Sequence, residues 1–293
     1  MANGQWFPQD WPERIRALAD GALTPVVPKR AATVMLLKDT DSGGPVVHML
    51  RRRASMAFAG GAYAYPGGGV DPRDDDLHVR WAGPTRAWWA ERLGVDETAA
   101  QAIVCAAVRE TYEEAGVLLA GPTPDSVVGD TTGADWEADR AAVAARDVSF
   151  AEFLDRRGLV LRSDLLGAWT RWITPEFEPR RYDTWFFVAA LPAGQRTRNA
   201  STEADRTVWI RPSDAAASYD KGELLMMPPT IATLRRLAPY ATAAEALAAA
   251  PDLDLTPVLA QARLEDGVVV LSWPGHDEFT RHIPVDTTGG GSA

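Results

Sequence analysis

The chain has 293 residues, 46% hydrophobic and 24% charged, which is the composition of an ordinary globular protein of one or two domains. Its formal net charge of -10 argues against a nucleic-acid partner held by phosphate contacts. The single cysteine, Cys105, excludes an intrachain disulfide and a cysteine-rich metal site. No apolar run approaches the roughly 18 residues of a membrane span, and we expect no signal peptide, so the expected location is the cytoplasm.

The first predicted elements are two strands, 30–39 and 45–53, which are rich in β-branched and apolar residues. The turn sequence TDSGG between them predicts a hairpin. A short strand is expected to begin the segment 62–76 and to break into a Pro/Gly loop. A short helix is expected within 77–95, where several tryptophans lie.

The clearest helix in the sequence spans 96–116. Asp96 is a suitable N-cap, and Gly116 stands where a helix adopts a left-handed stop. In the later segments, the spacing of apolar residues predicts helices and strands, and turn-forming residues mark their ends. Helices are expected within 133–158, 212–222, 228–240 and 241–250, and strands within 165–175, 180–191, 206–212 and 267–275.

Three glutamates crowd the end of the clearest helix, in the stretch AVRETYEEAGV (107–117). Glu110, Glu113 and Glu114 stand at positions i, i+3 and i+4, so their side chains share one face. Carboxylates placed in this way repel one another unless a cation lies among them, and an oxygen-only cluster suits Mg²⁺ or Mn²⁺. Arg109 is one turn from Glu113 and can hold a glutamate in place. The alternative interpretation is a solvated acidic helix end.

A glycine loop, YPGGGVDP (65–72), precedes the acidic helix. Glycines at this position let backbone carbonyls approach a cation. Together, Pro-Gly-Gly-x-Val-Asp and Arg-Glu-x-x-Glu-Glu-x-Gly-Val resemble the two halves of the Nudix box. The second half is matched at Arg109, Glu110, Glu113, Glu114, Gly116 and Val117.

The match departs from the continuous box in two ways. Thr111 stands where an aliphatic residue is expected. The first glutamate of the box is also missing, because Asp74 stands six residues after Gly68, whereas counting back from Arg109 leads to Gln101. A long insertion therefore separates the two halves. An interrupted box of this kind resembles the branch of the Nudix superfamily that includes the peroxisomal coenzyme A diphosphatase and its bacterial relatives.

The resemblance extends from about residue 30 to residue 240 and implies an α/β fold, a Nudix-type α/β/α sandwich with a mixed β-sheet and helical insertions. We expect a single Nudix domain over 30–250 that carries insertions at about 75–95 and 133–158. An N-terminal extension, 1–29, and a C-terminal extension, 251–293, which ends in a flexible tail, would flank it.

The resemblance implies a Mg²⁺- or Mn²⁺-dependent hydrolase that cleaves the diphosphate of a nucleoside diphosphate linked to another group. The metal ligands would be Glu110, Glu113 and Glu114, with the Gly68 carbonyl added. Glu110, oriented by Arg109, is one candidate for the catalytic base. Glu203, which lies outside the helix in the loop NASTEADR, is the other.

The substrate is less narrowly defined by the sequence. Arg51 and Arg53 lie on one face at a strand end and are predicted to bind phosphates, including the 3′-phosphate of coenzyme A. Asp183, a polar residue in an apolar strand, is predicted to face the site. The segment before the glycine loop keeps Arg53-Ala54 of the coenzyme A signature but has Phe58 where a second arginine belongs.

Coenzyme A or acyl-CoA is thus one substrate class, and ADP-ribose, NADH or dinucleotides are the alternative. A protein of another class, a Nudix domain that binds a nucleotide without cleaving it, is also open. Degenerate sensors usually lose one acid of the Glu-x-x-Glu-Glu group, and this chain keeps all three. The expected partner is a small-molecule nucleotide rather than a nucleic acid or a membrane, and a homodimer is left open.

Overall fold

The computed structural model describes residues 10–41, 43–55, 60–201, 203–265, 268–272 and 281–284. The chain divides into two units. The large unit comprises residues 30–170 and 185–255, and the small unit comprises 1–29, 171–184 and 256–293. Phe58 and the predicted flexible tail lie outside the described residues. Among the described residues, no helix combines the length and apolarity that a membrane crossing requires.

The large unit is built on a β-sheet in which the strands follow the order β10-β2-β1-β9-β8, with β3 paired to β2 and β4 paired to β1. Its strands are β1 (Lys29–Lys38), β2 (Val46–Arg52), β3 (Tyr63–Ala64), β4 (Gly67–Gly69), β8 (Gly167–Ile173), β9 (Tyr182–Ala190) and β10 (Ala204–Ile210). Strands β1 and β2 form the predicted antiparallel hairpin, in register at Leu37 and Val47. The end of β8 and the start of β9 belong to the small unit.

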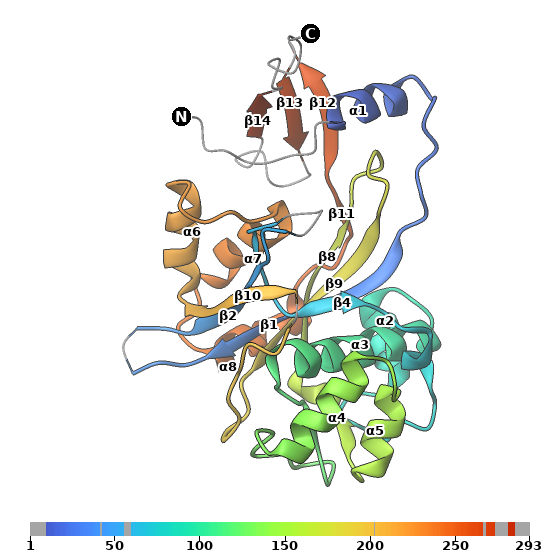
Figure 1. The fold of residues 1–293 in the computed structure, drawn as a ribbon, viewed down its shortest axis with the longest axis vertical. Helices are drawn as coiled ribbons and strands as arrows, with labels where there is room; N and C mark the ends of the chain where they lie inside the picture. The colour runs from blue at the N-terminus through green and yellow to red at the C-terminus, as the bar shows by residue number, and fades with distance from the viewer. Residues whose placement is uncertain are drawn as a thin grey trace. The chain divides into compact units, whose positions relative to one another are not determined.

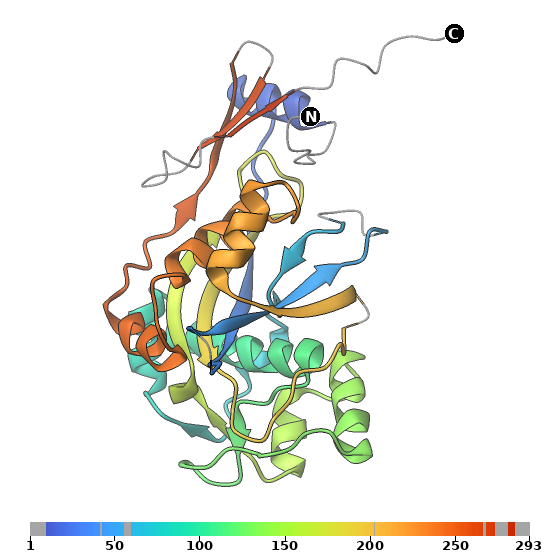
Figure 2. The same ribbon diagram turned by 90° about the vertical axis from the view of Figure 1, so that its left-hand side faces the viewer.

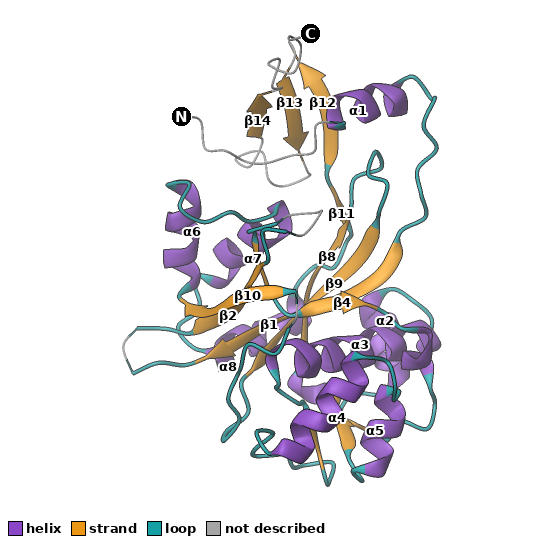
Figure 3. Cartoon of the chain, in the orientation of Figure 1, coloured by secondary structure: helices purple, strands orange, loops and turns teal. Residues whose placement is uncertain are grey.

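Helices cover both faces of this sheet, which gives the predicted α/β/α layers (Figures 1 and 2). The helices of the large unit are α2 (Arg86–Leu93), α3 (Glu97–Ala115), α4 (Ala134–Ala144), α5 (Phe150–Arg156), α6 (Pro212–Asp220), α7 (Pro228–Leu237) and α8 (Ala243–Ala249). Short 3-10 turns are η1 (Pro72–Asp75), η2 (Ser163–Leu165) and η3 (Ala250–Asp252). Helix α3 lies against the sheet, with α4 and α5 on its other side, and α6 and α7 lie on the opposite face of the sheet (Figure 3).

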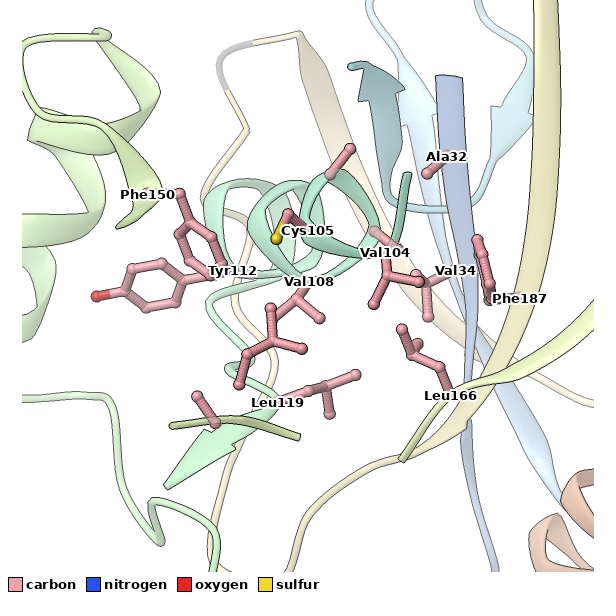
Figure 4. Packing of buried hydrophobic residues seen from close by; sticks show 14 of the residues in the cluster. Ala32, Val34, Val104, Cys105, Val108, Tyr112, Leu119, Phe150, Leu166 and Phe187 are labelled. Carbon is pink, nitrogen blue, oxygen red and sulfur yellow. The ribbon is translucent and has the colours of Figure 1, made fainter. Parts of the chain in front are cut away.

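The core of the large unit surrounds α3 (Figure 4). Val104 and Val108 of α3 point towards Val34 of β1 and Leu119, while Tyr112 stacks on Phe153 of α5 with ring centroids 5.1 Å apart. Every residue of α3 from Ala99 to Arg109 is buried, so the core encloses this part of the helix on all sides. The position of its last two turns, which carry the glutamates, is therefore set by the core.

The two predicted insertions contribute to this same cluster. Trp89 and Leu93 from the first, and Phe150 and Phe153 from the second, are buried in it together with the sheet residues. A second small sheet pairs β5 (Trp81–Ala82), in the first insertion, with β7 (Val160–Arg162), which follows the second insertion. Strand β6 (Ala120–Gly121) completes that sheet on the other side of β7.

The small unit joins three separate stretches of the chain. It contains α1 (Trp11–Ala19), β11 (Val258–Leu259), β12 (Gln261–Glu265), β13 (Val268–Ser272) and β14 (Arg281–Pro284). Strands β12, β13 and β14 form an antiparallel sheet. The Trp11 ring packs edge-on against Phe177 at 5.0 Å, and Arg14 donates to the Phe177 carbonyl at 2.7 Å. Neither α1 nor this grouping was predicted from the sequence.

One segment differs from its prediction. The glycines of YPGGG were expected to lie in a loop, but Gly67–Gly69 form strand β4, antiparallel to β1 with Gly68 opposite Ala32. Glycine is required here by the close approach of the chains, because a Cβ on Gly67 would lie 2.5 Å from the Ala32 carbonyl oxygen. Pairing with the first residues of β1 thus holds the glycine segment beside α3 (Figure 1).

Candidate metal and catalytic centre

Helix α3 begins and ends as its sequence predicts. The Asp96 side chain accepts a hydrogen bond from the Ala99 backbone N–H at 2.7 Å, and Gly116 closes the helix with a φ of 69°. Glu110, Glu113 and Glu114 occupy the last two turns before this stop.

Arg109 is the centre of the cluster. Its Nη1 donates to Glu110 Oε1 at 2.7 Å and to Glu113 Oε1 at 3.0 Å. Its Nη2 donates to the Gly69 carbonyl at 2.8 Å, which ties α3 to β4. The guanidinium is only 9% exposed, and the two glutamate side chains are 13% and 14% exposed. The predicted contact between Arg109 and Glu113 is confirmed.

Asp74 supplies the remaining partner of Arg109. Its carboxylate accepts from Arg109 Nε at 3.0 Å and from Nη2 at 3.0 Å, and it is 2% exposed. Asp74 is itself held by η1, because the Asp71 backbone N–H donates to Asp74 Oδ2 at 2.8 Å. This aspartate, which stands six residues after Gly68 where the sequence of the box has its first glutamate, is therefore a buried partner of Arg109.

Gln101, the other residue to which the motif count leads, serves elsewhere. Its side-chain amide donates to the Asp76 carbonyl at 2.6 Å, and its oxygen accepts from Arg86. Counting forward from Gly68 rather than back from Arg109 thus identifies the arginine's partner. The sequence showed Asp74 at that place but gave no evidence that it would reach Arg109 across the insertion.

Strand β4 closes the cluster from the other side. The Gly67 N–H donates to Glu114 Oε2 at 2.9 Å, and Ser201 Oγ donates to Glu114 Oε1 at 3.4 Å. A Cβ on Gly68 would lie 2.6 Å from the Glu110 carboxyl carbon, so only glycine permits this approach. The Gly68 backbone and the Glu110 carboxylate therefore share one small space.

Burial makes these carboxylates difficult to ionise as they stand. It raises the pKa of Glu110 to about 7, against the opposing effect of Arg109. Burial, with the negative charge of Glu110 added, raises the pKa of Glu114 to about 8. The pKa of Glu113 is also raised by burial. The cluster holds more negative charge than Arg109 alone balances, which is the condition under which a bound cation stabilises it.

The donor set fits a hard divalent cation. It consists of carboxylate oxygens beside a glycine backbone, the ligand type of Mg²⁺ and Mn²⁺. In the described part of the chain, no three His, Cys, Asp or Glu side chains are already arranged as a metal cage. Arg109 contacts only Oε1 of Glu110 and of Glu113, so the second oxygen of each is outside those contacts. Three observations support a divalent cation at this site. They are the oxygen donors, the negative charge that Arg109 does not balance, and the close approach of the Gly68 backbone to the Glu110 carboxylate.

Glu203, predicted as a second candidate base, lies in the loop before β10. Its carboxylate is 59% exposed and stands 3.8 Å from Arg52 Nη2. Its charge is among the effects that raise the pKa of Glu114, after burial and Glu110. The structure thus brings Glu203 into electrostatic range of the cluster. The loop is fixed to β2 by the hydrogen bond from the Arg53 N–H to the Glu203 carbonyl at 2.8 Å.

The predicted phosphate-binding arginines lie at the same end of β2. Arg51 forms an ion pair with Asp205 at 2.7 Å and is 40% exposed, while Arg53 is exposed. Asp183 belongs to the small unit, where Arg171 holds both of its oxygens, at 2.8 and 2.6 Å. The ion pair with Arg171 accounts for a buried carboxylate in an apolar strand. A substrate contact by Asp183 stays a prediction.

Comparison with known proteins places this geometry in a family. The model of the NUDT19 Nudix domain matches residues 91–237, which is half of the chain. The acyl-coenzyme A diphosphatase NUDT19 of Gallus gallus is 26% identical over 233 residues, covering 66% of this chain and 61% of that protein. The human protein of the same name is 31% identical, covering 47% of this chain and 39% of that protein.

A solved structure agrees with this assignment. The Nudix hydrolase from Alicyclobacillus acidocaldarius superimposes with a TM-score of 0.66 and 26% identity, covering 76% of this chain and 96% of that chain. The chain spans between about two-fifths and three-fifths of the length of the curated relatives it matches. The matched region includes α3 with its four-residue cluster Arg109, Glu110, Glu113 and Glu114. The chain therefore belongs to the Nudix superfamily, in the family of the NUDT19 Nudix domain.

Proposed function

We propose that this chain is a Mg²⁺- or Mn²⁺-dependent hydrolase that cleaves the diphosphate of a nucleoside diphosphate linked to another group. The observation that carries the proposal is the buried cluster at the end of α3, in which Asp74, Glu110 and Glu113 contact Arg109 and Glu114 is held beside them by the Gly67 N–H. The cluster thus holds four carboxylates and one guanidinium, and its unbalanced negative charge suits a bound cation. Coenzyme A or acyl-CoA is the leading substrate, in line with the names of the curated relatives.

Each residue of the cluster has a distinct part in this proposal. Glu110, Glu113 and Glu114 would hold the cation, with the Gly68 carbonyl as a further oxygen. When bound, the cation would neutralise charge on the diphosphate oxygens and lower the pKa of a water molecule. Arg109 fixes the rotamers of Glu110 and Glu113 through Nη1. Gly67 fixes Glu114 from β4.

The reaction is a substitution at phosphorus. The oxygen of a water forms a new bond to phosphorus, the bridging P–O bond breaks, and the proton of the water passes to a carboxylate. Glu110 is one candidate for this base, because Arg109 Nη1 orients its carboxylate at the cluster. Glu203, which is exposed and within electrostatic range of Glu114, is the other.

Arg51 and Arg53 are proposed to bind the phosphates of the substrate. They lie at the end of β2 beside the loop of Glu203, and a guanidinium matches the geometry of a phosphate. We also propose that the chain works in the cytoplasm on a small-molecule nucleotide, without a nucleic-acid partner, consistent with its net charge of -10.

The test is a substrate screen. Coenzyme A, acyl-CoA, ADP-ribose, NADH and dinucleoside polyphosphates are incubated with the protein and Mg²⁺ or Mn²⁺, and the products are identified by mass. Cleavage of coenzyme A or acyl-CoA at the diphosphate supports the leading substrate, and preferential cleavage of ADP-ribose or NADH moves the protein to the alternative. Tight binding of one compound without cleavage of any would identify a nucleotide sensor instead.

A further inference from the structure

Arg146 occupies an unusual backbone position. It follows α4, and its φ of 64° is the one positive φ at a non-glycine residue in the described part of the chain. The Arg146 N–H donates to the Val143 carbonyl and the Asp147 N–H to the Ala142 carbonyl, both at 2.9 Å, which is the pattern of a Schellman helix end. Glycine is the favoured residue at such a position. An arginine there indicates that its side chain has a role for which the backbone is strained.

The Arg146 side chain leads towards the loop that follows β4. Its Nε lies 3.6 Å from Asp71 Oδ2, and the side chain is 75% exposed. Arg73 contacts the same Asp71 carboxylate through Nε at 3.0 Å and Nη2 at 3.1 Å. Arg73 Nη1 also donates to the Arg146 carbonyl at 3.1 Å, which supports the strained residue. Two guanidiniums thus face one carboxylate, and one positive charge is in excess.

This cationic pair adjoins the glutamate cluster. The Asp71 N–H donates to Asp74, which in turn holds Arg109. Arg109 in turn donates to Glu113 Oε1 at 3.0 Å. A chain of hydrogen-bonded residues, Asp71, Asp74 and Arg109, therefore leads from the carboxylate that Arg146 faces to a proposed metal ligand.

A purely structural role explains Arg146 poorly. An exposed ion pair at 3.6 Å contributes little to stability, and Asp71 already has both oxygens contacted by Arg73. A glycine at this position would relieve the backbone. The remaining property of Arg146 is an exposed guanidinium beside a site that must receive a diphosphate against the charge of several carboxylates.

We propose that Arg146, supported by Arg73, binds a non-bridging phosphate oxygen of the diphosphate substrate held at the glutamate cluster. The identity of that substrate rests on the proposed function. A guanidinium presents paired N–H donors that match phosphate oxygens, and its positive charge offsets the repulsion between the diphosphate and the glutamates. Arg146 is in this account a specificity residue for the second phosphate, distinct from Arg51 and Arg53 at the end of β2.

Binding and turnover are measured separately. The probe is adenosine 5′-(α,β-methylene)diphosphate with Mg²⁺, whose bridging carbon resists hydrolysis, and AMP serves as the probe with one phosphate. Arg146→Gly keeps the left-handed backbone and removes the side chain. Arg146→Lys keeps the positive charge but lacks the paired N–H donors of the guanidinium. Arg156→Ala, which removes an exposed arginine of α5, is the matched control. Calorimetry gives the Kd of each protein, and thermal unfolding gives its Tm.

Arg146→Gly is expected to weaken binding of the methylene diphosphate about tenfold or more, because one charge-assisted contact is lost. Its binding of AMP should change less than threefold, and its Tm should not fall. Arg146→Lys should lie between the parent and the glycine variant, and Arg156→Ala should match the parent. The proposal is overturned if Arg146→Gly binds the methylene diphosphate as tightly as the parent does, or if the parent does not bind it.

Turnover distinguishes this inference from the proposed function. A parent that binds the methylene diphosphate through Arg146 but cleaves none of the screened compounds supports the inference and contradicts the hydrolase. A parent that cleaves them, with kcat/KM unchanged in Arg146→Gly, supports the hydrolase and contradicts the inference.

Discussion

Asp74 and Arg109 form a buried two-pronged ion pair that joins the segment after β4 to helix α3. The carboxylate receives Nε and Nη2 of the guanidinium, each at 3.0 Å, and the two side chains are 2% and 9% exposed. The residues between them in sequence include the whole first insertion and most of α3. The ion pair thus rejoins the two halves of a motif that the sequence separates.

Asp74→Asn should destabilise the protein and lower its activity. Removing one charge from a buried pair leaves Arg109 short of a partner and typically costs about 3–5 kcal/mol. Urea unfolding would measure the loss. Asp75→Asn, the exposed neighbour in η1, is the matched control and should unfold like the parent. Equal stability of the two variants would show that the Asp74–Arg109 pair is energetically unimportant.

Glu114→Gln should leave the fold intact and remove most of the activity. The side chain keeps its shape and can still accept from the Gly67 N–H, but an anionic ligand is lost. Loss of such a transition-state contact costs roughly 10²-fold or more in kcat. Glu97→Gln, at the exposed start of α3, is the control and should keep full activity. Glu114→Gln with activity within threefold of the parent, at saturating Mg²⁺, would refute the metal role.

Mg²⁺ should stabilise the protein more at pH 8 than at pH 6. Burial raises the pKa of Glu110 to about 7 and of Glu114 to about 8, above the value of 4.5 in an unfolded chain. Their contribution to stability is fully present below pH 4.5 and is lost as the pH rises through 7 and 8. Mg²⁺ binds the deprotonated carboxylates, so it offsets this loss of stability more at pH 8 than at pH 6.

Differential scanning calorimetry with and without Mg²⁺ measures this effect. The rise in Tm on adding Mg²⁺ should be larger at pH 8, and EDTA should remove it. Glu114→Gln should show a smaller rise at both pH values. A rise in Tm that is the same at pH 6 and pH 8, or none at all, would contradict a metal held by these glutamates.

His48 should make the protein sensitive to mild acid. It is fully buried in β2, neither ring nitrogen has a hydrogen-bond partner among the described residues, and its ring lies 5.1 Å from that of Trp209. Burial lowers its pKa from 6.5 to about 4, so below pH 6.5 the unfolded chain binds a proton that the folded protein does not. Stability is therefore lost as the pH falls from about 6.5 to 4, by up to about 3 kcal/mol.

His48→Leu isolates this contribution. The free energy of unfolding in urea is measured for the parent and the variant at pH 7 and pH 5, which cancels the carboxylates common to both. The parent should lose more stability than His48→Leu over this interval. An identical pH dependence in the two proteins would show that His48 is protonated as easily in the fold as in the unfolded chain.

Coenzyme A should be preferred over its 3′-dephospho form if Arg51 and Arg53 meet the 3′-phosphate. A charge-assisted contact to phosphate is worth roughly 1.5–3 kcal/mol, which corresponds to a tenfold to hundredfold difference in kcat/KM. Arg53→Ala should remove most of that preference and leave cleavage of dephospho-coenzyme A nearly unchanged. Equal kcat/KM of the parent on both substrates would remove these arginines from the substrate site.

The sequence was a sufficient guide where the determinants are local. The hairpin of β1 and β2 follows from β-branched runs around a turn, and α3 follows from a cap at Asp96 and a stop at Gly116. The shared face of Glu110, Glu113 and Glu114 follows from helical spacing alone. Local signals of this kind need no knowledge of the rest of the chain.

The remaining features depend on contacts between distant segments. The glycine run Gly67–Gly69 was predicted to be a loop because glycine has low strand propensity, and it becomes a strand only by pairing with the start of β1. Whether Asp74 or Gln101 meets Arg109 depends on how the insertion folds back. The spacing of residues in the sequence likewise does not predict that Asp183 pairs with Arg171 or that Arg146 ends a helix.

The most direct test of the hydrolase is product analysis with coenzyme A in ¹⁸O-labelled water. With Mg²⁺ or Mn²⁺, the parent should yield adenosine 3′,5′-bisphosphate and 4′-phosphopantetheine, with one ¹⁸O in one of the two products, because water attacks a single phosphorus. EDTA and Glu114→Gln should each abolish both products. If the folded, metal-supplemented parent cleaves neither coenzyme A nor any other diphosphate of the panel, or if Glu114→Gln cleaves them equally well, the account of the glutamate cluster as a metal-dependent catalytic centre is contradicted.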